Sequence, residues 1–169
     1  MKFGVSFPQS EIGNDPVVIR DFVQTAEDLG FERLALVDHI LGAKDARDTP
    51  WAVHYTAEYG FHEPMTLFAW MAGFTTKIQL VTANVVLPQR QTELVAKQAA
   101  EIDILTGGRL VLGVGVGWSS AEFKALGMDF DNRGDRIEEQ VELLRRLWSD
   151  ELVDFQGQWH QMRDMGMNP

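Results

Sequence analysis

The sequence predicts an α/β fold built on a parallel sheet, and three observations support this prediction. Four short segments rich in β-branched residues are separated by longer segments whose apolar residues recur at helical spacing. Glycine or proline stands near most of the boundaries between these segments. Strands that alternate with helices form βα units, in which the strands run parallel. Parallel sheets bind ligands at the carboxyl ends of their strands, so a functional site is expected there.

The composition is that of an ordinary globular protein with an acidic surface. The 169 residues fit one domain, which we expect to span residues 1–169, and 45% of them are hydrophobic and 24% charged. With 15 Lys and Arg against 25 Asp and Glu, the net charge is −10. Such a surface repels phosphate backbones, so nucleic acid is not an expected partner.

Cysteine usage and hydropathy indicate where the protein works. The sequence contains no cysteine, which excludes disulfides and thiolate chemistry and fits a reducing compartment. The apolar run 110–118 is far shorter than the roughly 20 residues that a membrane helix requires. Lys2 leads directly into a strand-like segment without a leader-peptide pattern. We therefore expect a cytoplasmic protein with no membrane segment.

The first βα unit has clear boundaries. Its predicted strand, Lys2–Pro8, ends at a proline. Asp15 is placed to accept backbone N–H groups as the N-cap of a helix, and Pro16 suits the first helical position. Apolar residues then recur at helical spacing until Gly30, where the helix is expected to end.

The second unit contains a strand, a long loop and a helix. The strand is predicted over Arg33–His39, and residues 38–62 form a loop of 25 residues, which is too long for a simple connector. Glu63 and Pro64 predict the start of a helix that runs to about Phe74, with the carboxylate near the positive end of the helix.

The remaining segments continue the alternation. A third strand is predicted over 78–88, a third helix over 92–105 before Gly107 and Gly108, and a fourth strand over 109–117. A short helix over 120–127 and a longer one over 133–148 follow. On the longer helix we expect an apolar face formed by Ile137, Val141, Leu144 and Trp148. On its opposite side we expect an ion pair between Glu142 and Arg146.

The predicted carboxyl ends of the strands carry polar residues or glycines. They are Gln9, Asp38 with His39, Asn84 with Val85, and residues 115–118. An imidazole exchanges protons near neutral pH, so His39 is the candidate for general acid or base catalysis. The alternative is that His39 only forms a hydrogen bond to a neighbouring loop. We expect Asp38 to orient a loop or a backbone amide.

The stretch LVLGVGVGW places Gly113, Gly115 and Gly117 on one face of the predicted fourth strand, because successive side chains alternate. A face without side chains admits close approach of a flat ligand. Alternatively, the glycines relieve crowding in the sheet or form a turn. A dinucleotide fingerprint would require glycine at 118 or 120, where the chain has Trp118 and Ser120.

The long loop contributes aromatic residues and potential metal ligands. Trp51, His54, Tyr55, Tyr59, Phe61 and His62 suit a substrate lid, although for Tyr59 and Phe61 we favour simple packing. Asp38, His39, His54, His62 and Glu63 lie in the same region. None of them shows the spacing of a known zinc motif, so no metal site is predicted.

Several stretches together resemble one known family. They are MKFGVSFPQSE, VDHILG, FHEP, VVLPQRQ, VAKQAAEIDILTGGRL and LGVGVGW followed by EFKALG. On these stretches the chain resembles the bacterial-luciferase-like superfamily, and within it most closely the coenzyme F420-dependent oxidoreductases. The resemblance implies a TIM-type (β/α)8 barrel that binds a flavin or deazaflavin at the carboxyl ends of its strands.

The resemblance also implies roles for individual residues. His39 would be catalytic beside the reacting edge of the ring, Trp51 would contact substrate, and a non-proline cis peptide would join Asn84 to Val85. The residues expected to contact the cofactor are Asp38, Asn84, Val85, Gly113, Gly115, Gly117 and Trp118.

The length departs from the family, because a (β/α)8 barrel takes about 250 residues and this chain supplies four predicted strands. The stretch LVDFQGQWHQM resembles the hairpin that precedes the fifth strand. An open half-barrel exposes its edges and inner face, which predicts homo-oligomerisation or poor solubility. Two hypotheses follow. One is a small-molecule oxidoreductase that uses F420, or alternatively FMN and oxygen. The other is a non-catalytic half-barrel that assembles with a partner chain.

Overall fold

The computed structural model describes residues 1, 3–44 and 55–169 of the chain. The helices are α1 (Pro16–Asp28), α2 (Pro64–Ala72), α3 (Thr92–Thr106), α4 (Ser120–Ala125) and α5 (Arg133–Ser149), with a 3-10 turn η2 at Leu87–Gln89. The strands are β1 (Gly4–Ser6), β2 (Arg33–Leu36), β3 (Gln79–Thr82), β4 (Val85–Val86), β5 (Leu110–Val111), β6 (Val114–Gly115), β7 (Val153–Gln156) and β8 (Gln161–Met165). None of the described helices has the length and apolar character needed to cross a membrane.

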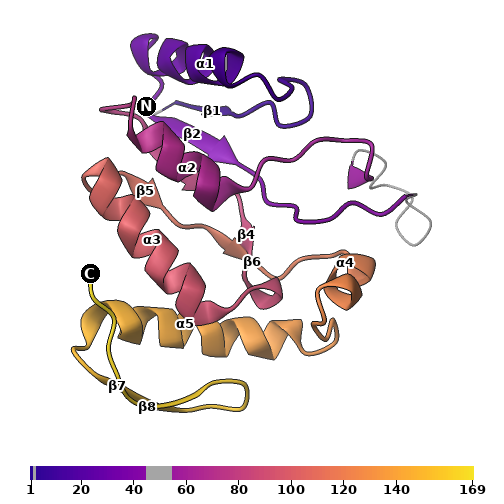
Figure 1. Ribbon diagram of the computed structural model, residues 1–169, viewed down its shortest axis with the longest axis vertical. Coiled ribbons are helices and arrows are strands. Elements are labelled where there is room, and N and C mark those ends of the chain that lie inside the picture. The colour runs from indigo at the N-terminus through magenta and orange to yellow at the C-terminus, as the bar shows by residue number, and fades with distance from the viewer. Residues whose placement is uncertain (2, 45–54) are drawn as a thin grey trace. The chain divides into compact units, whose positions relative to one another are not determined.

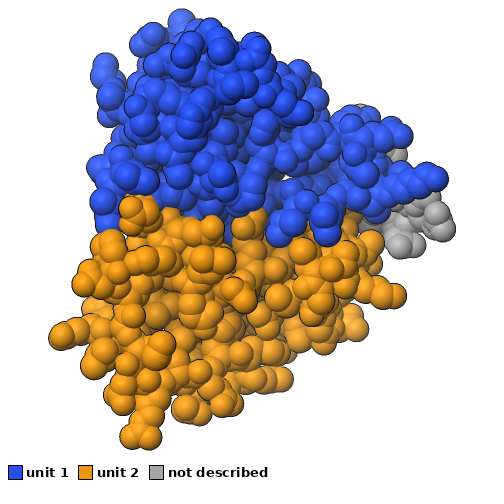
Figure 2. Space-filling view, viewed as in Figure 1, with its two compact units in different colours: residues 1–85, 102–114 blue, residues 86–101, 115–169 orange. Residues whose placement is uncertain are grey.

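The chain forms two compact units (Figure 2). Unit 1 comprises Met1–Val85 and Ile102–Val114, and unit 2 comprises Val86–Glu101 and Gly115–Pro169. The two units are interleaved in the sequence, and α3 contributes its first residues to unit 2 and its last residues to unit 1.

Unit 1 is built on a four-stranded sheet in the order β1-β2-β3-β5, and every neighbouring pair is parallel. This arrangement confirms the predicted parallel βα units. Figure 1 shows α1 and α2 beside the strands of this sheet. The register aligns Ser6, Ala35, Val81 and Val111 in one row across all four strands.

The two faces of this sheet differ in burial. Leu34, Leu36 and Leu80 are completely buried, and α1 and α2 supply the apolar residues Ile19, Val23, Phe68 and Met71 to the core of unit 1. The opposite face is less covered, because in its row Ala35 and Val81 are half-buried and Val111 is 37% exposed. One face of the sheet is therefore the core of unit 1, and the other is partly open.

Local capping fixes where the first two helices begin. The Asp15 carboxylate accepts a 2.8 Å hydrogen bond from the Val17 amide, and Pro16 opens α1. The Glu63 carboxylate likewise accepts from the Thr66 amide at 2.6 Å, before Pro64 at the start of α2. Each cap satisfies a backbone donor that the helix itself leaves without a partner. Both predicted helix starts are confirmed.

The third and fourth predicted strands are each divided in two, which corrects the expectation of continuous strands. β3 ends at Thr82 and β4 starts at Val85, while β5 ends at Val111 and β6 starts at Val114. The cause is the hydroxyl of Thr82, which donates to the Gly113 carbonyl and accepts from the Gly113 amide, both at 2.8 Å. The Thr82 side chain thus bonds the amide and the carbonyl of Gly113, which would otherwise pair with backbone groups of the neighbouring strand. β4 and β6 then pair with each other.

The buried face of α5 also differs from the prediction. It consists of Gln140, Leu143, Leu144 and Leu147, whereas Trp148 is 44% exposed and Ile137 and Val141 are only half-buried. The buried amide of Gln140 is satisfied on this face, because it donates to the carbonyls of Leu87 and Arg90 and to the Thr92 hydroxyl. The predicted ion pair is also wrong, since Arg146 pairs with Asp150 at 3.2 Å.

β7 and β8 in unit 2 form an antiparallel hairpin, as the resemblance of this stretch implied. The carboxylate of Glu139 on α5 holds its turn by accepting hydrogen bonds from the amides of Gln158, Trp159 and His160. The His160 imidazole also bonds Glu139 through Nδ1 at 2.8 Å and Thr92 Oγ1 through Nε2 at 2.7 Å. Burial raises the pKa of Glu139, but these hydrogen bonds lower it more, so the pKa lies below its ordinary value.

The amino end of the sheet in unit 1 is tied together by two charged residues. The Glu27 carboxylate accepts from the amides of Thr76, Lys77 and Ile78 at 2.9, 2.6 and 2.8 Å. The Arg109 guanidinium donates to the carbonyls of Thr75 and Ile78 at 2.9 and 2.7 Å. Burial raises the pKa of Glu27, but the amide hydrogen bonds and the charge of Arg109 lower it more, so its pKa is depressed.

We predict that Glu27→Gln destabilises the chain by about 1–3 kcal/mol at pH 7, because three amides lose a charged acceptor. A depressed carboxylate pKa stabilises the folded state above the ordinary pKa of glutamate, and the stabilisation is lost as the pH falls through the folded value. In urea titrations, the difference in unfolding free energy between wild type and Glu27→Gln should be constant above about pH 5 and shrink below about pH 4. A difference that grows on acidification would contradict this account.

Candidate functional site

The carboxyl ends of three neighbouring strands in unit 1 bring together three residues that the sequence singled out. β2 ends at Leu36, β3 at Thr82 and β5 at Val111, and His39, Asn84 and Gly113 follow within three residues of these ends. Because the strands are parallel and adjacent, the chain leaves all three at the same edge of the sheet. This edge of unit 1 is the candidate site.

His39 is buried, with 8% of its surface exposed, and is flanked by aromatic rings. Its imidazole lies edge-on to the rings of Tyr55 and Phe61, with centroid distances of 5.5 and 5.3 Å. Tyr55 and Phe61 are themselves stacked at 5.5 Å. These rings shield the imidazole from water.

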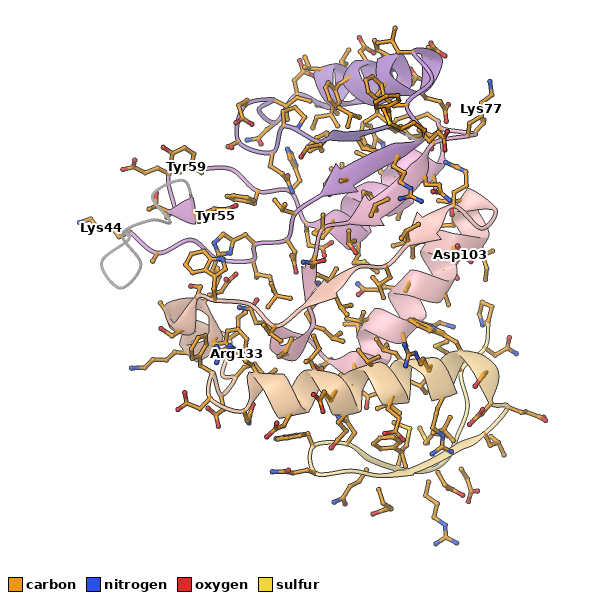
Figure 3. All side chains as sticks on the ribbon, turned by 180° about the vertical axis from the view of Figure 1, so that it is seen from behind. Lys44, Tyr55, Tyr59, Lys77, Asp103 and Arg133 are labelled. Carbon is orange, nitrogen blue, oxygen red and sulfur yellow. The ribbon has the colours of Figure 1, made fainter. Side chains whose placement is uncertain are left out.

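The loop after β2 gives mixed outcomes for the predicted lid. Phe61 packs, as expected, against His39 and Tyr55. Tyr59 is 36% exposed, and Figure 3 shows it on the same segment as Tyr55. Trp51, the predicted substrate contact, and His54 lie outside the described residues.

Gly113 is needed for a close approach between two strands. A Cβ atom there would meet the carbonyl oxygen of Thr82 at a distance that real Cβ atoms do not adopt, and the Asn84 side-chain oxygen at 3.1 Å. The Val85 amide donates to the Gly113 carbonyl at 2.8 Å, and the Val85 side chain is completely buried. The missing side chain of Gly113 therefore serves the packing of Thr82 and Asn84, as the alternative interpretation stated.

A non-proline cis peptide lies at the end of β3, one residue earlier than predicted. It joins Ala83 to Asn84, whereas the resemblance placed it between Asn84 and Val85. The amide of Ala83 donates to the Leu36 carbonyl and that of Val85 donates to the Gly113 carbonyl. Asn84 therefore lies between two residues whose amides bond to different segments, one at the end of β2 and the other just after β5.

The remaining predicted cofactor residues belong to unit 2, apart from Asp38, which is half-buried in unit 1. Gly115 closes β6, and Gly117 has a φ of +76°, a left-handed conformation that glycine adopts without strain. A side chain on Gly117 would collide with Val86 and Phe123. Trp118 is half-buried. Because the strand is interrupted at Gly113, the three glycines do not share one continuous strand face, which corrects the sequence interpretation.

Four of the five potential metal ligands, Asp38, His39, His62 and Glu63, lie in the part of the chain that the structure describes. Within residues 1, 3–44 and 55–169, no three His, Asp or Glu side chains are placed to hold a metal ion. The His62 ring is directed to the Gly13 carbonyl, 3.1 Å from Nε2, and packs on Phe7 at 5.9 Å. The Glu63 carboxylate caps α2.

Gln9 stands at the end of the predicted first strand, but the sequence predicted none of its contacts. Its side chain is 5% exposed. Its Nε2 donates to the carbonyls of Val37 and His62 at 2.7 and 3.3 Å, and its Oε1 accepts from the His62 amide at 2.9 Å. These partners are 28 and 53 residues away in sequence, so no local pattern announces them.

Parallel βα units with a buried histidine at their carboxyl ends define an α/β protein with a candidate site at that edge of the sheet. The chain belongs to the luciferase-like monooxygenase family, which it matches over residues 1–169. This match confirms the resemblance and the TIM-barrel family that it implied.

Three relatives illustrate the match. An FMNH2-dependent dimethylsulfone monooxygenase of Pseudomonas putida is 32% identical over 123 residues, covering 69% of this chain and 34% of that protein. The crystal structure of monooxygenase RslO1 from Streptomyces bottropensis covers 100% of this chain and 49% of its own, with a TM-score of 0.79 and 27% identity. A coenzyme F420-dependent tetrahydromethanopterin reductase from Methanopyrus kandleri covers 99% of this chain and 46% of its own, with a TM-score of 0.73.

The last of these is 20% identical, so its likeness shows the fold alone. The chain spans about a third of the length of the curated relative and about half of each solved chain. The relatives' activities are therefore properties of longer proteins.

We predict that Gly113→Ala destabilises the chain by about 1–3 kcal/mol, because the new Cβ forces the backbone of Thr82 away. Gly134→Ala is the matched control, since nothing lies within 4 Å of its added Cβ and it sits in α5. There the substitution should be neutral or stabilising by up to about 1 kcal/mol. Denaturant unfolding measures both, and equal effects would show that Gly113 has no special packing role.

Proposed function

We propose that this chain carries the histidine-bearing part of an oxidoreductase that transfers a hydride between coenzyme F420 and a small organic substrate. The observation that carries the proposal is His39, which is buried under aromatic rings at the carboxyl end of β2. A buried imidazole is the kind of group that accompanies hydride transfer with a proton. Membership of the luciferase-like family supports this function for the site.

The residues at this edge of unit 1 fit a flat heteroaromatic ring. Asn84 supplies a side-chain amide and His39 supplies an imidazole. On the neighbouring sheet face, the paired residues Ala35 and Val81 are only half-buried. Val85, whose side chain is buried and whose amide is bonded to Gly113, would act by fixing the backbone there. We propose contacts to the ring system by Asp38, His39, Asn84 and Gly113 of unit 1, with Val85 holding the backbone beside them. The roles of Gly115, Gly117 and Trp118 stay predictions from the resemblance.

His39 has a defined role in this proposal. The deazaflavin supplies a carbon that accepts or donates hydride when it is bound. When a substrate alcohol is oxidised, its carbon loses hydride and its oxygen loses a proton, and the imidazole takes that proton. In the reverse direction the imidazolium returns it. The rings of Tyr55 and Phe61 exclude water from the imidazole during the transfer.

Reduced FMN is the alternative cofactor, with oxygen as co-substrate. The FMNH2-dependent monooxygenase from Pseudomonas putida favours this alternative, because its identity to the chain is higher than that of the F420-dependent reductase. Titrations with F420 and with FMN, followed by ligand fluorescence, separate the two.

We predict that the chain binds F420 saturably and more tightly than FMN, and that His39→Ala keeps the F420 affinity but lowers turnover about 100- to 10,000-fold. Turnover is measured as the change in F420 absorbance with a panel of small secondary alcohols and ketones.

His160→Ala is the matched control, because this histidine is similarly buried, at 6% exposure, but packs between Glu139 and Thr92 in unit 2. It should lower stability without a selective loss of turnover. Equal losses of affinity and turnover in His39→Ala would make His39 a binding residue. A folded chain that binds neither cofactor would contradict the proposed function.

A second candidate function is an assembling half-barrel, and the partly open sheet face of unit 1 favours it. The edge strands are β1 and β5, and the row Ser6, Ala35, Val81 and Val111 lies on the open face. A (β/α)8 barrel has eight parallel strands. Two copies related by a two-fold axis would supply eight, with β5 of one copy beside β1 of the other. We therefore propose a second copy of the chain as the partner of this face.

We predict that the chain is a discrete dimer by sedimentation, and that Val111→Lys makes it monomeric by placing a charge on the open face of β5. Leu29→Lys is the control, because Leu29 is also exposed, at 72%, but lies at the end of α1. The control should remain dimeric. A soluble, monomeric wild type would rule out pairing between copies.

A further inference from the structure

We propose that Gln9 is a positioning residue that sets the place of His39, an inference that rests on the proposed function for its catalytic consequence. Gln9 lies in the loop that follows β1. Its side chain bonds the two backbone segments that carry the imidazole and its aromatic cover.

The Gln9 amide joins these two segments directly. One of its hydrogen bonds goes to the carbonyl of Val37, two residues before His39, at 2.7 Å. The other two form a closed pair with the peptide of His62, where Nε2 donates to the carbonyl at 3.3 Å and Oε1 accepts from the amide at 2.9 Å. His62 follows Phe61, whose ring covers His39 at 5.3 Å.

Only glutamine provides this set of bonds at this length. The group must donate twice and accept once, which a primary amide does and a carboxylate does not. Glutamate would place its charge against the carbonyls of Val37 and His62, and leucine would leave three backbone groups without partners in a site where Gln9 is 5% exposed. Asparagine keeps the amide but is one methylene shorter.

Neighbouring contacts hold Gln9 itself in place. The backbone amide of Gln9 donates to the Phe7 carbonyl at 2.9 Å, and the Phe7 ring packs edge-on to the His62 ring at 5.9 Å. The His62 imidazole bonds the Gly13 carbonyl in the same loop after β1. The loop after β1 is thus fixed to the loop before α2 from both sides. Because Gln9 bonds both Val37 and His62, a displaced Gln9 side chain would change the position of His39 relative to Phe61.

The test compares Gln9→Leu with Gln24→Leu in the full chain. Gln24 makes one comparable bond, from Nε2 to the Phe74 carbonyl at 3.3 Å, but it lies on α1, away from the loops of the site. Imidazole nitrogen–proton correlation spectra report the surroundings of His39 without any cofactor. We expect Gln9→Leu to displace the His39 signals and Gln24→Leu to leave them unchanged, whatever each does to the free energy of unfolding.

Gln9→Asn is the second variant, used if Gln9→Leu does not fold, and it should displace the same signals. Where turnover is measurable, Gln9 variants should lower kcat about 10- to 100-fold with little change in the F420 affinity. Unchanged His39 signals in a folded Gln9 variant would overturn the proposal. The outcome is independent of the proposed function, because an inactive wild type would overturn that function and leave the spectra able to decide the role of Gln9.

Discussion

The parallel register of β1, β2, β3 and β5 is the constraint on which the candidate site depends. Because these strands run the same way, each delivers the residues that follow it to one edge of unit 1. His39, Asn84 and Gly113 are 45 and 29 residues apart in the sequence, yet they follow neighbouring strands. Strand pairing brings these residues to one edge, and the loop contacts of Gln9 then fix the backbone around His39.

The two ends of this sheet use polar groups differently. At the amino end, Glu27 and Arg109 are saturated with backbone hydrogen bonds, which stabilises the starts of the strands. At the carboxyl end, Gln9 holds two loops by one amide, and His39 is surrounded by rings. Stability is therefore concentrated away from the edge that carries the candidate chemistry, and the carboxyl edge depends on a few specific contacts.

The sequence predicted features that depend on local patterns and missed those that depend on distant contacts. Asp15 with Pro16 and Glu63 with Pro64 mark helix starts within a few residues, so their caps were predictable. The strand breaks were not, because Thr82 reaches Gly113 across 31 residues. The buried face of α5 includes Gln140, whose partner Leu87 is 53 residues away. His39 was found by its place after a strand, whereas Gln9 was identified only by its bonds to Val37 and His62.

The most direct test of the account is to map which backbone amides respond to cofactor, using nitrogen–proton correlation spectra of the labelled chain during titration with F420. The account predicts that the perturbed signals include those of Asp38, His39, Asn84 and Gly113, while those of the β7–β8 hairpin stay unchanged. Perturbations confined to the hairpin, or saturable binding that leaves the amide of His39 unaffected, would contradict the claim that the carboxyl edge of unit 1 carries the cofactor.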